Sequence, residues 1–166
     1  MALLSRRGEA LNTCGDLPAT GSACPNFTLT GANLQDFSLA DLSGKTVVLN
    51  IFPSIDTPTC ATSVRTFNAK LNDVAGVEVI NVSADLPFAQ SRFCGAEGLE
   101  KVSNASTFRN SDFGKTFGVE IIDSGMKGLL ARAVVVIRDG KIIHGELVPE
   151  IAQEPNYEAA LSAAQS

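Results

Sequence analysis

The chain has 166 residues, of which 45% are hydrophobic and 19% charged, and its net charge at pH 7 is −5. This length and composition predict one globular domain spanning residues 1–166, with enough apolar side chains for a buried core. The acidic balance argues against a nucleic-acid partner, because binding phosphates requires a basic surface.

No segment is predicted to enter a membrane. A membrane-spanning helix needs about 18 consecutive apolar residues, and no run in the chain approaches that length. The first residues, "MALLSRRGEALNTCGD", lack the apolar stretch of a signal peptide. We therefore expect a cytoplasmic protein with no membrane partner, whose thiols are kept reduced at rest.

The first predicted element is a β-hairpin, an extension over about residues 1–15. The stretch "ALLSRRGEALNTC" contains two short runs that meet at Gly8, and a glycine in this position favours a tight turn. A stretch rich in proline and glycine, "DLPATGSACPNFTLTG", then leads into the core.

Two central strands and an intervening helix follow. The run "TVVLNIF" (46–52) is almost continuously apolar, which is typical of a strand buried on both faces. From Cys60 onward, apolar residues at helical spacing predict an amphipathic helix that ends near Gly76. The run "VEVINVSA" (77–84) predicts a second central strand.

The second half of the chain alternates short helices with a hairpin. The stretch "DLPFAQSRFCGAEG" predicts a helix with Pro87 near its start, and "RNSDFGKTFGV" predicts another short helix. The stretch "RAVVVIRDGKIIHGELV" predicts a hairpin that turns at Asp139 and Gly140. The chain then closes with a helix that has Pro155 in its first turn. This order predicts an α/β fold with a central mixed β-sheet flanked by helices.

The cysteines do not form a metal-binding pattern. The four are Cys14, Cys24, Cys60 and Cys94, no pair has CxxC spacing, and the only histidine is His144, within a predicted strand. These spacings argue against a zinc site and against a cysteine–histidine protease dyad. A chain of this length also has no need of disulfide staples.

Cys60 has an unusual position, between the carboxyl end of a central strand and the first turn of a helix. Helix amino termini present unpaired N–H groups and a partial positive charge, which favour a thiolate. A free thiol is only about 3% ionised at pH 7, and a pKa near 6 would need about 3.4 kcal/mol more stabilisation of the thiolate. A helix terminus supplies at most about 2 kcal/mol, so a reactive thiol here also needs a nearby cation. The local pattern alone leaves open whether Cys60 is reactive or inert.

A sequence motif favours a reactive Cys60 over an inert one. The stretch "PSIDTPTC" fits the peroxiredoxin signature Pro-x-x-x-Thr-x-x-Cys, with Pro53, Thr57 and Cys60 in register. The wider stretches "VVLNIFPSIDTPTCATSVRTFN", "SADLPFAQSRFCGAEG" and "KGLLARAVVVI" also resemble the bacterial thiol peroxidase branch of this family, the atypical 2-Cys peroxiredoxins. The resemblance runs from about Asp16 to the end of the chain.

The resemblance implies a thioredoxin-like fold and a thiol-dependent peroxidase that needs no metal, haem or other cofactor. Cys60 would be the peroxidatic cysteine, Cys94 the resolving cysteine and Arg132 the cation beside the thiolate. Thr57 and Pro53 would complete the site. A hydroperoxide would be the substrate, a Cys60–Cys94 disulfide would form within one chain, and thioredoxin would reduce it. The resemblance also implies a homodimer.

The residues around Arg132 agree with that role. In the run "RAVVVI", strand alternation places Arg132, Val134 and Val136 on one face, and an arginine on an apolar face favours an anionic partner. Arg92 and Arg109 remain alternatives for the cation. Cys14 and Cys24 match no family motif and are interpreted as incidental thiols.

Two alternative hypotheses for the function also depend on Cys60. One is a redox-sensing or holdase module that signals through oxidation of Cys60. The other is a thiol–disulfide oxidoreductase of the thioredoxin type, and the lack of CxxC argues against it, because Thr57 stands where the second thiol is needed. Sustained turnover of peroxide separates the enzyme from the sensor.

Overall fold

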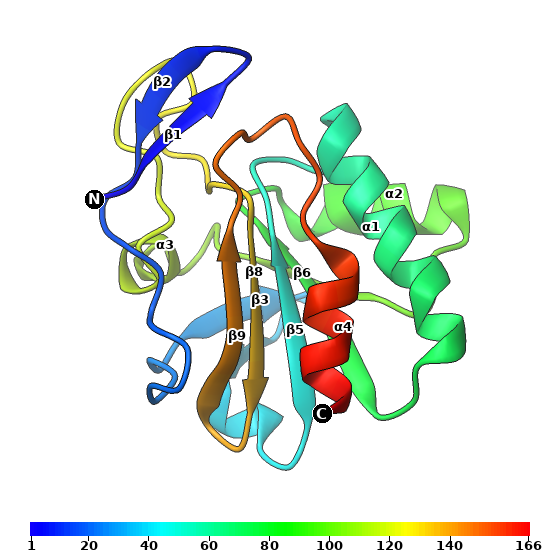
Figure 1. Ribbon diagram of the computed structural model, residues 1–166. Helices are drawn as coiled ribbons and strands as arrows, with labels where there is room; N and C mark the ends of the chain where they lie inside the picture. Colours follow the sequence, from blue (N-terminus) through cyan, green and yellow to red (C-terminus); the bar gives the residue numbers. More distant parts are fainter.

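A seven-stranded mixed β-sheet forms the centre of the computed structural model, which describes residues 1–166. The strands lie in the order β4-β3-β7-β6-β5-β8-β9, and β1 and β2 form a separate two-stranded sheet (Figure 1). The strands are β1 (Leu3–Arg6), β2 (Glu9–Asn12), β3 (Thr28–Gly31), β4 (Asp36–Ser38), β5 (Thr46–Ile51), β6 (Val77–Ser83), β7 (Ser103–Ser106), β8 (Ala133–Arg138) and β9 (Lys141–Leu147). The helices are α1 (Pro58–Lys70), α2 (Pro87–Glu97), α3 (Asp112–Thr116) and α4 (Tyr157–Gln165), with 3-10 turns η1 (Leu39–Leu42) and η2 (Leu71–Asp73).

The pairing of the strands brings three loops to one edge of the sheet. Strands β5, β6 and β7 are parallel, and β8 runs antiparallel to both β5 and β9. Ile51, the last residue of β5, pairs with Ala133, the first of β8, which in turn pairs with Leu147, the last of β9. The segment after β5, the segment before β8 and the segment after β9 therefore meet at this edge.

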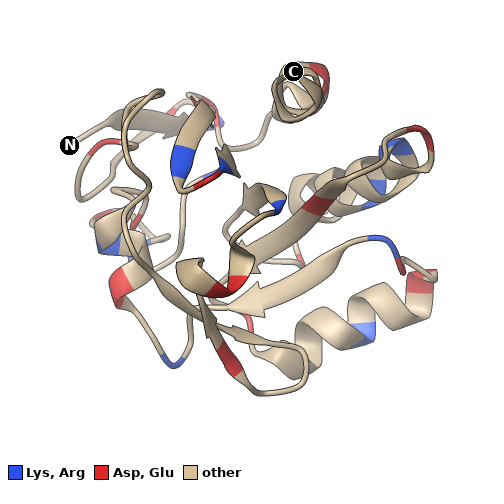
Figure 2. Ribbon diagram, turned by 90° about the horizontal axis from the view of Figure 1, so that it is seen from below, with Lys and Arg blue, Asp and Glu red and all other residues tan.

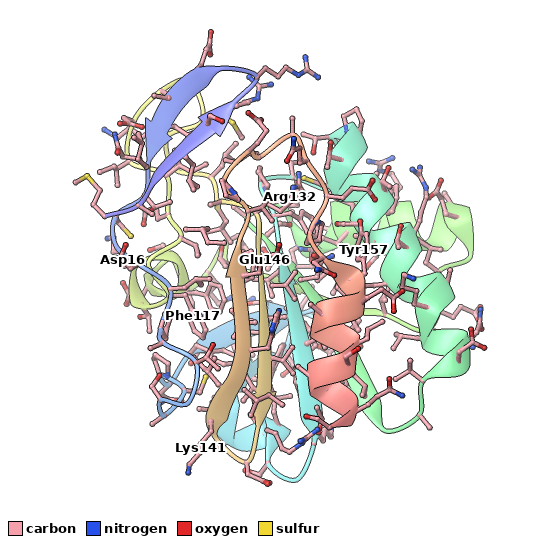
Figure 3. All side chains as sticks on the ribbon, in the orientation of Figure 1. Asp16, Phe117, Arg132, Lys141, Glu146 and Tyr157 are labelled. Atoms are coloured by element: carbon pink, nitrogen blue, oxygen red, sulfur yellow. The ribbon has the colours of Figure 1, made fainter.

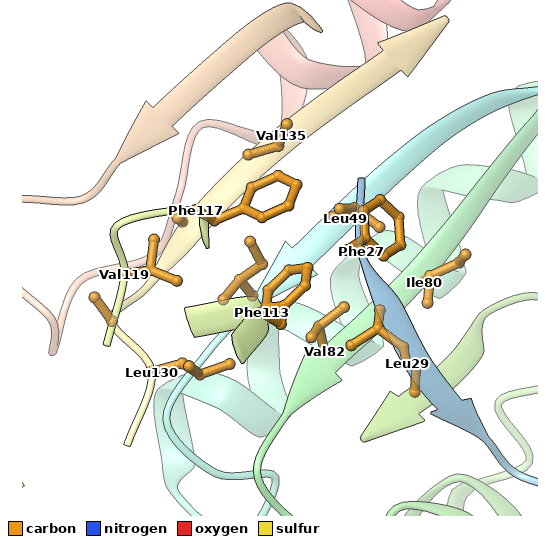
Figure 4. Close-up of a cluster of buried hydrophobic side chains, with 14 of the residues drawn as sticks. Phe27, Leu29, Leu49, Ile80, Val82, Phe113, Phe117, Val119, Leu130 and Val135 are labelled. Atoms are coloured by element: carbon orange, nitrogen blue, oxygen red, sulfur yellow. The ribbon is translucent and has the colours of Figure 1, made fainter. Parts of the chain in front are cut away.

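Both faces of the central strands are covered, as their apolar sequences predicted. On one face an aromatic cluster of Phe27, Phe113 and Phe117 fills the space beside α3 (Figure 4). The rings of Phe113 and Phe117 stack with their centroids 4.5 Å apart, and Phe27 meets each of them edge-on at 5.7 Å. Such contacts add specific ring geometry to apolar burial, so this cluster fixes α3 against the sheet.

The other face is covered by α1, α2 and α4. Val64 and Phe67 of α1 are fully buried there, and Leu161 of α4 packs in the same cluster. Val134 and Val136 of β8 face this layer, whereas Val135 faces the aromatic side. The alternation expected for this strand is thus observed.

The amino-terminal hairpin is present where the sequence predicted it. It turns at Arg7 and Gly8, whose φ angles of 51° and 87° both lie in the left-handed region. The hairpin lies against the segment that follows β9 (Figure 1). Ser5 N donates to the Pro149 carbonyl and Ile151 N donates to the Ser5 carbonyl, each at 2.8 Å. The hairpin is therefore attached to the edge of the sheet where the three loops meet.

Other elements depart from the sequence prediction. Strands β3, β4 and β7 were not predicted, because they have three or four residues each and β7, "SNAS", is polar. The last helix begins at Tyr157 with Asn156 as its cap, so the prediction that Pro155 lies within its first turn was wrong. The Asn156 side chain accepts a hydrogen bond from Ala159 N at 3.0 Å, and this cap sets the start of the helix. None of the helices is long and apolar enough to span a membrane.

Gly118 offers a test of the packing between the amino-terminal segment and α3. Its φ is +69°, and a Cβ at this position would lie 2.3 Å from the Asp16 carbonyl oxygen. We expect Gly118→Ala to lower the free energy of unfolding by about 2 kcal/mol or more, through backbone strain and overpacking. Gly125→Ala is the control, because a Cβ there meets nothing within 4 Å. Urea denaturation would measure both variants, and equal stabilities would contradict the prediction.

Candidate active site

Cys60 lies in the first turn of α1, fully buried at the edge where the loops meet. Pro58 begins the helix, and the first backbone hydrogen bond of the turn runs from Ala61 N to the Thr57 carbonyl at 3.0 Å. The amides of Thr59 and Cys60 therefore precede the helical ladder and point toward the helix end, where a negative charge is favoured.

The loop between β5 and α1 is fixed by a carboxylate from the neighbouring strand. Asp85, just after β6, accepts hydrogen bonds from Ser54 Oγ and Ile55 N, each at 2.7 Å. Ser83 Oγ donates to the same carboxylate at 2.6 Å. Asp85 was not singled out in the sequence, although an acidic residue directly after a buried parallel strand is a signal for such a position.

Thr57 does not cap α1 with its side chain. Its hydroxyl donates to the Ser54 carbonyl at 2.9 Å, which leaves the hydroxyl oxygen able to accept a hydrogen bond. Thr59 Oγ1 donates to the Ala152 carbonyl at 3.0 Å and so ties α1 to the segment after β9. The first turn of α1 is thus joined to two of the three loops.

A cavity of about 120 Å³ lies between these loops. Its lining residues are Arg6, Arg7, Pro53, Thr57, Pro58, Thr59, Met126, Arg132, Ile151 and Ala152. Three of the predicted site residues, Pro53, Thr57 and Arg132, therefore share one cavity at the amino end of α1. Two lining residues, Arg6 and Arg7, come from the hairpin and were not singled out in the sequence.

Arg132 is the cation that contacts Cys60. It is only 2% exposed, and Nη2 donates to Cys60 Sγ at 3.3 Å while Nε donates to the Ile151 carbonyl at 2.8 Å. Nη1 is buried and has no hydrogen-bond partner, which leaves one donor unused beside the sulfur. Figure 3 shows Arg132 at the end of the sheet that carries the amino end of α1.

The other two candidate arginines lie elsewhere. Arg92 pairs with Asp56 at 3.0 Å and Arg109 with Asp36 at 2.9 Å, all four side chains being exposed. The Asp56 carboxylate, four residues before Cys60, is therefore turned to solvent and neutralised by Arg92. Neither alternative arginine takes the place beside the sulfur.

Cys94 is buried in α2 and faces β7. Asn104 Nδ2 donates to Cys94 Sγ at 3.4 Å. Burial raises the pKa of the Cys94 thiol, the charge of Glu97 raises it further, and the hydrogen bond from Asn104 opposes them. Cys94 is therefore held as a protonated thiol, and it forms no disulfide in this structure.

A chain of buried and half-buried polar side chains runs from Cys60 to Cys94. Ser63 Oγ donates to the Cys60 carbonyl at 2.7 Å, and Asn50 Nδ2 donates to Ser63 Oγ at 3.2 Å. Asn50 Nδ2 also donates to Asn81 Oδ1 at 3.0 Å, and Asn81 Nδ2 donates to Asn104 Oδ1 at 3.1 Å. We call Asn50, Asn81 and Asn104, which are paired in register on β5, β6 and β7, the asparagine ladder. Its sequence signal is one asparagine within each of these strands.

Cys24 and Cys14 neither line the cavity nor form a hydrogen bond with Arg132. Burial raises the pKa of the Cys24 thiol to about 11, which makes it a poor nucleophile at neutral pH. The sulfur of Cys14 lies 3.5 Å from the Gly114 carbonyl, near α3. No three histidine, cysteine, aspartate or glutamate side chains are grouped so that they could hold a metal ion.

Glu150 fastens the hairpin to the segment beside Arg132. Its carboxylate accepts hydrogen bonds from Ser5 Oγ at 2.7 Å and from the amides of Arg7 and Ala152 at 3.0 Å. These bonds, led by that from Ser5, lower the pKa of Glu150 to about 2. The next residue, Ile151, supplies the carbonyl that holds Arg132, so one short segment fixes both the hairpin and the guanidinium.

A cysteine at a helix amino end, directly after a central strand and beside a buried arginine, defines a thiol redox protein with a thioredoxin-like sheet. The chain belongs to the Redoxin family, whose model matches residues 19–161. A thiol peroxidase from Mycobacterium tuberculosis is 61% identical to it over 164 residues, which are 98% of each chain. That match takes in nearly all of the hairpin, which precedes the stretch from Asp16 to the end of the chain that carries the motif resemblance.

Solved structures agree with this assignment. A peroxiredoxin-like protein from Aquifex aeolicus superposes with a TM-score of 0.90 at 36% identity, covering 99% of this chain and 96% of its own. A thiol peroxidase from Chromobacterium violaceum also gives a TM-score of 0.90, at 22% identity, covering 98% of this chain and 95% of its own. At that lower identity the likeness concerns the fold alone.

The attachment by Glu150 predicts a pH-dependent stability. The pKa of Glu150 is lowered from 4.5 to about 2 in the folded protein, so its stabilisation is complete above pH 4.5 and is lost as the pH falls toward 2. We expect Glu150→Gln to destabilise the protein at pH 7, and this deficit to shrink progressively below pH 4.5. Urea denaturation across this range would measure the difference between wild type and variant.

Glu9→Gln is the matched control for this experiment, since Glu9 is exposed on the same hairpin. It should unfold like the wild type at every pH. A Glu150→Gln deficit that stayed constant down to pH 3 would show that the charge of this carboxylate does not hold the hairpin.

Proposed function

We propose that the protein is a thiol-dependent peroxidase that reduces hydrogen peroxide and organic hydroperoxides to water and alcohols through Cys60. The observation that carries the proposal is the contact of 3.3 Å between Arg132 Nη2 and Cys60 Sγ, with Arg132 lining a cavity together with Thr57 and Pro53. A buried guanidinium at hydrogen-bonding distance stabilises negative charge on sulfur. Membership of the Redoxin family supports the same chemistry.

In the first step the Cys60 thiolate attacks the peroxide oxygen that carries hydrogen. The sulfur electron pair forms the S–O bond while the O–O bond breaks, so the sulfur becomes a sulfenic acid and an alkoxide or hydroxide leaves. The leaving oxygen takes up a proton and departs as alcohol or water. Sulfur is oxidised by two electrons, and the peroxide is reduced by the same two.

Three groups hold the peroxide during this step. The unused Nη1 donor of Arg132 and the backbone amide of Cys60 would donate to the peroxide oxygens, and would stabilise the charge that develops on the leaving oxygen. The Thr57 hydroxyl already donates to the Ser54 carbonyl, so its oxygen would accept the hydrogen bond from the peroxide O–H. Pro53 is buried on the cavity wall and would limit the access of water to the sulfur.

In the second step Cys94 resolves the sulfenic acid. Its thiol attacks the Cys60 sulfur, water is released, and an intramolecular Cys60–Cys94 disulfide forms. Cys94 belongs to α2 and contacts Asn104 of β7, so α2 must open for the sulfurs to meet. A dithiol of the thioredoxin type then reduces the disulfide by thiol–disulfide exchange and regenerates both thiols.

The family resemblance also supports proposals for the domain organisation, the location and the oligomeric state of the protein. The chain of 166 residues would work as one domain in the cytoplasm, with its hairpin as an integral extension. A homodimer is supported by the exposed apolar side chains of Leu86, Phe88 and Phe108, which follow the carboxyl ends of the adjacent strands β6 and β7.

Cys60→Ser tests the proposed function directly. We expect the variant to retain the fold and to lose nearly all turnover of hydrogen peroxide, because a serine hydroxyl is not ionised at neutral pH. Loss of NADPH in an assay coupled to thioredoxin and thioredoxin reductase would measure turnover. Cys14→Ser and Cys24→Ser are the controls and should stay close to wild type. Substantial turnover by Cys60→Ser would place the reaction at another residue.

Opening of α2 can be slowed by a single substitution. Gly95 lies within the helix, a Cβ there meets nothing within 4 Å, and alanine favours helix by about 1 kcal/mol over glycine. We expect Gly95→Ala to slow formation of the Cys60–Cys94 disulfide and to increase oxidation of Cys60 to sulfinic acid under excess peroxide. Mass spectrometry of peroxide-treated protein would quantify both products.

Gly98→Ala is the contrasting variant for this experiment. Gly98 caps α2 in the left-handed conformation with a φ of 66°, where alanine is strained, so this change weakens the helix end instead of strengthening it. It should not increase sulfinic acid. Equal behaviour of the two variants would contradict the view that opening of α2 limits the second step.

A further inference from the structure

Two arginines of the hairpin stand apart from all the others in the chain. Five of the seven arginines donate side-chain hydrogen bonds to protein acceptors, namely Arg65, Arg92, Arg109, Arg132 and Arg138. The guanidinium groups of Arg6 and Arg7 form no hydrogen bond or ion pair with the protein, and both residues are exposed. They are therefore available to a ligand.

These two arginines line the same cavity as Arg132, and no acidic residue lines it. Three guanidinium groups thus surround a space of about 120 Å³ in a protein whose net charge is −5. Elsewhere basic and acidic positions are interspersed over the fold, as Figure 2 shows. A concave site lined by charges of one sign concentrates ligands of the opposite sign, so this cavity favours anions.

The position of Arg6 and Arg7 is fixed by the fold. Arg6 pairs with Glu9 across the hairpin, and the amide of Arg7 donates to the Glu150 carboxylate at 3.0 Å. Arg7 has a φ of 51°, a left-handed conformation that this tight turn imposes. The backbone that carries the two guanidinium groups is thus held at the rim of the cavity and loses little freedom when a ligand binds.

The same cavity is also lined by residues next to the reactive sulfur. Thr57 and Arg132 lie beside Cys60, while Met126 and Ile151 supply apolar lining. A ligand that reaches from the sulfur to the rim would place a hydroperoxide at one end, a hydrocarbon in the middle and an anion at the other end. Hydrogen peroxide is too small to use the rim.

We propose that Arg6 and Arg7 form an anion subsite that selects organic hydroperoxides carrying a carboxylate. The guanidinium plane matches the two oxygens of a carboxylate and binds them through paired hydrogen bonds. The subsite acts on binding and orientation of the substrate, whereas Cys60, Thr57 and Arg132 carry out the chemistry. This inference rests on the proposed peroxidase function and names its substrate class.

The experiment compares three peroxides that Cys60 would reduce by the same reaction. They are a short tertiary alkyl hydroperoxide ending in a carboxylate, the methyl ester of the same compound, and hydrogen peroxide. Dithiothreitol serves as the reductant, so that recognition of a protein reductant does not enter. For the wild type we expect kcat/KM to be about tenfold higher for the carboxylate than for the ester, because KM is lower for the carboxylate. Added salt should diminish this difference.

The double variant Arg6→Gln/Arg7→Gln should lose this preference. Its kcat/KM for the carboxylate should fall about tenfold, while the values for the ester and for hydrogen peroxide stay within about twofold of wild type. Those two substrates also show that the variant is folded and active. Arg6→Lys/Arg7→Lys should recover part of the preference, because it restores the charge without the paired hydrogen bonds.

A matched control removes the same two charges outside the cavity. Lys115 and Lys141 are exposed and do not line it, so Lys115→Gln/Lys141→Gln should keep the preference for the carboxylate. A similar loss in this control would assign the effect to net charge and overturn the subsite.

Three other results would also overturn the proposal. A double hairpin variant that slows all three peroxides equally would show that the arginines only support the fold, and one that changes nothing would show that no anion binds there. An effect seen with thioredoxin but not with dithiothreitol would assign the arginines to docking of the reductant. Failure of the wild type with all three peroxides would instead overturn the proposed peroxidase function, on which the subsite depends.

Discussion

The hydrogen bond of 2.8 Å from Arg132 Nε to the Ile151 carbonyl is the constraint on which the site depends. A guanidinium that is 98% buried is costly unless its donors are paired, and here one backbone carbonyl and one sulfur are its partners. The carbonyl fixes the plane of the guanidinium, and that plane places one donor on the sulfur and leaves Nη1 without a protein partner. Any movement of the segment after β9 would therefore move the charge away from Cys60.

This dependence explains why so many contacts converge on that segment. Residues 148–152 leave the sheet at Leu147, directly beside the start of β8, and would be an ordinary mobile loop if nothing held them. The hairpin pairs with the segment through Ser5, the Glu150 carboxylate binds back to the hairpin, and Thr59 joins the segment to α1. The hairpin thus belongs to the active site as much as the central strands do, since it fixes the carbonyl that orients Arg132.

The sequence predicted the parts of this arrangement that are local. Strands β5 and β6, the hairpin at Gly140 and the place of Cys60 at the start of α1 all follow from apolar periodicity and turn residues. The motif and the alternation in β8 added Arg132. The contacts of Asp85 and Glu150 could not be predicted, because each joins residues distant in sequence and depends on the register of strands. Strand β7 was missed for the same reason: its four residues are polar and become a strand only by pairing with β6 and β3.

In the proposed mechanism α2, and not α1, is the helix that opens, and the asparagine ladder supports that choice. Cys60 belongs to a helix whose first turn is attached to Ala152 through Thr59 and whose carbonyl at Cys60 accepts from Ser63. Cys94 is held to the ladder only through a contact with sulfur, which is a weak hydrogen-bond acceptor. When Cys94 leaves, Asn104 keeps its bond from Asn81, so departure of the thiol leaves the buried ladder connected. Opening of α2 then breaks its own contacts with its neighbours, namely the hydrogen bonds from Gln90 Nε2 to Ser83 Oγ and to the Ala105 carbonyl and the ion pair of Glu97 with Arg65. The ladder meanwhile keeps Cys60 and its oxidised sulfur in place.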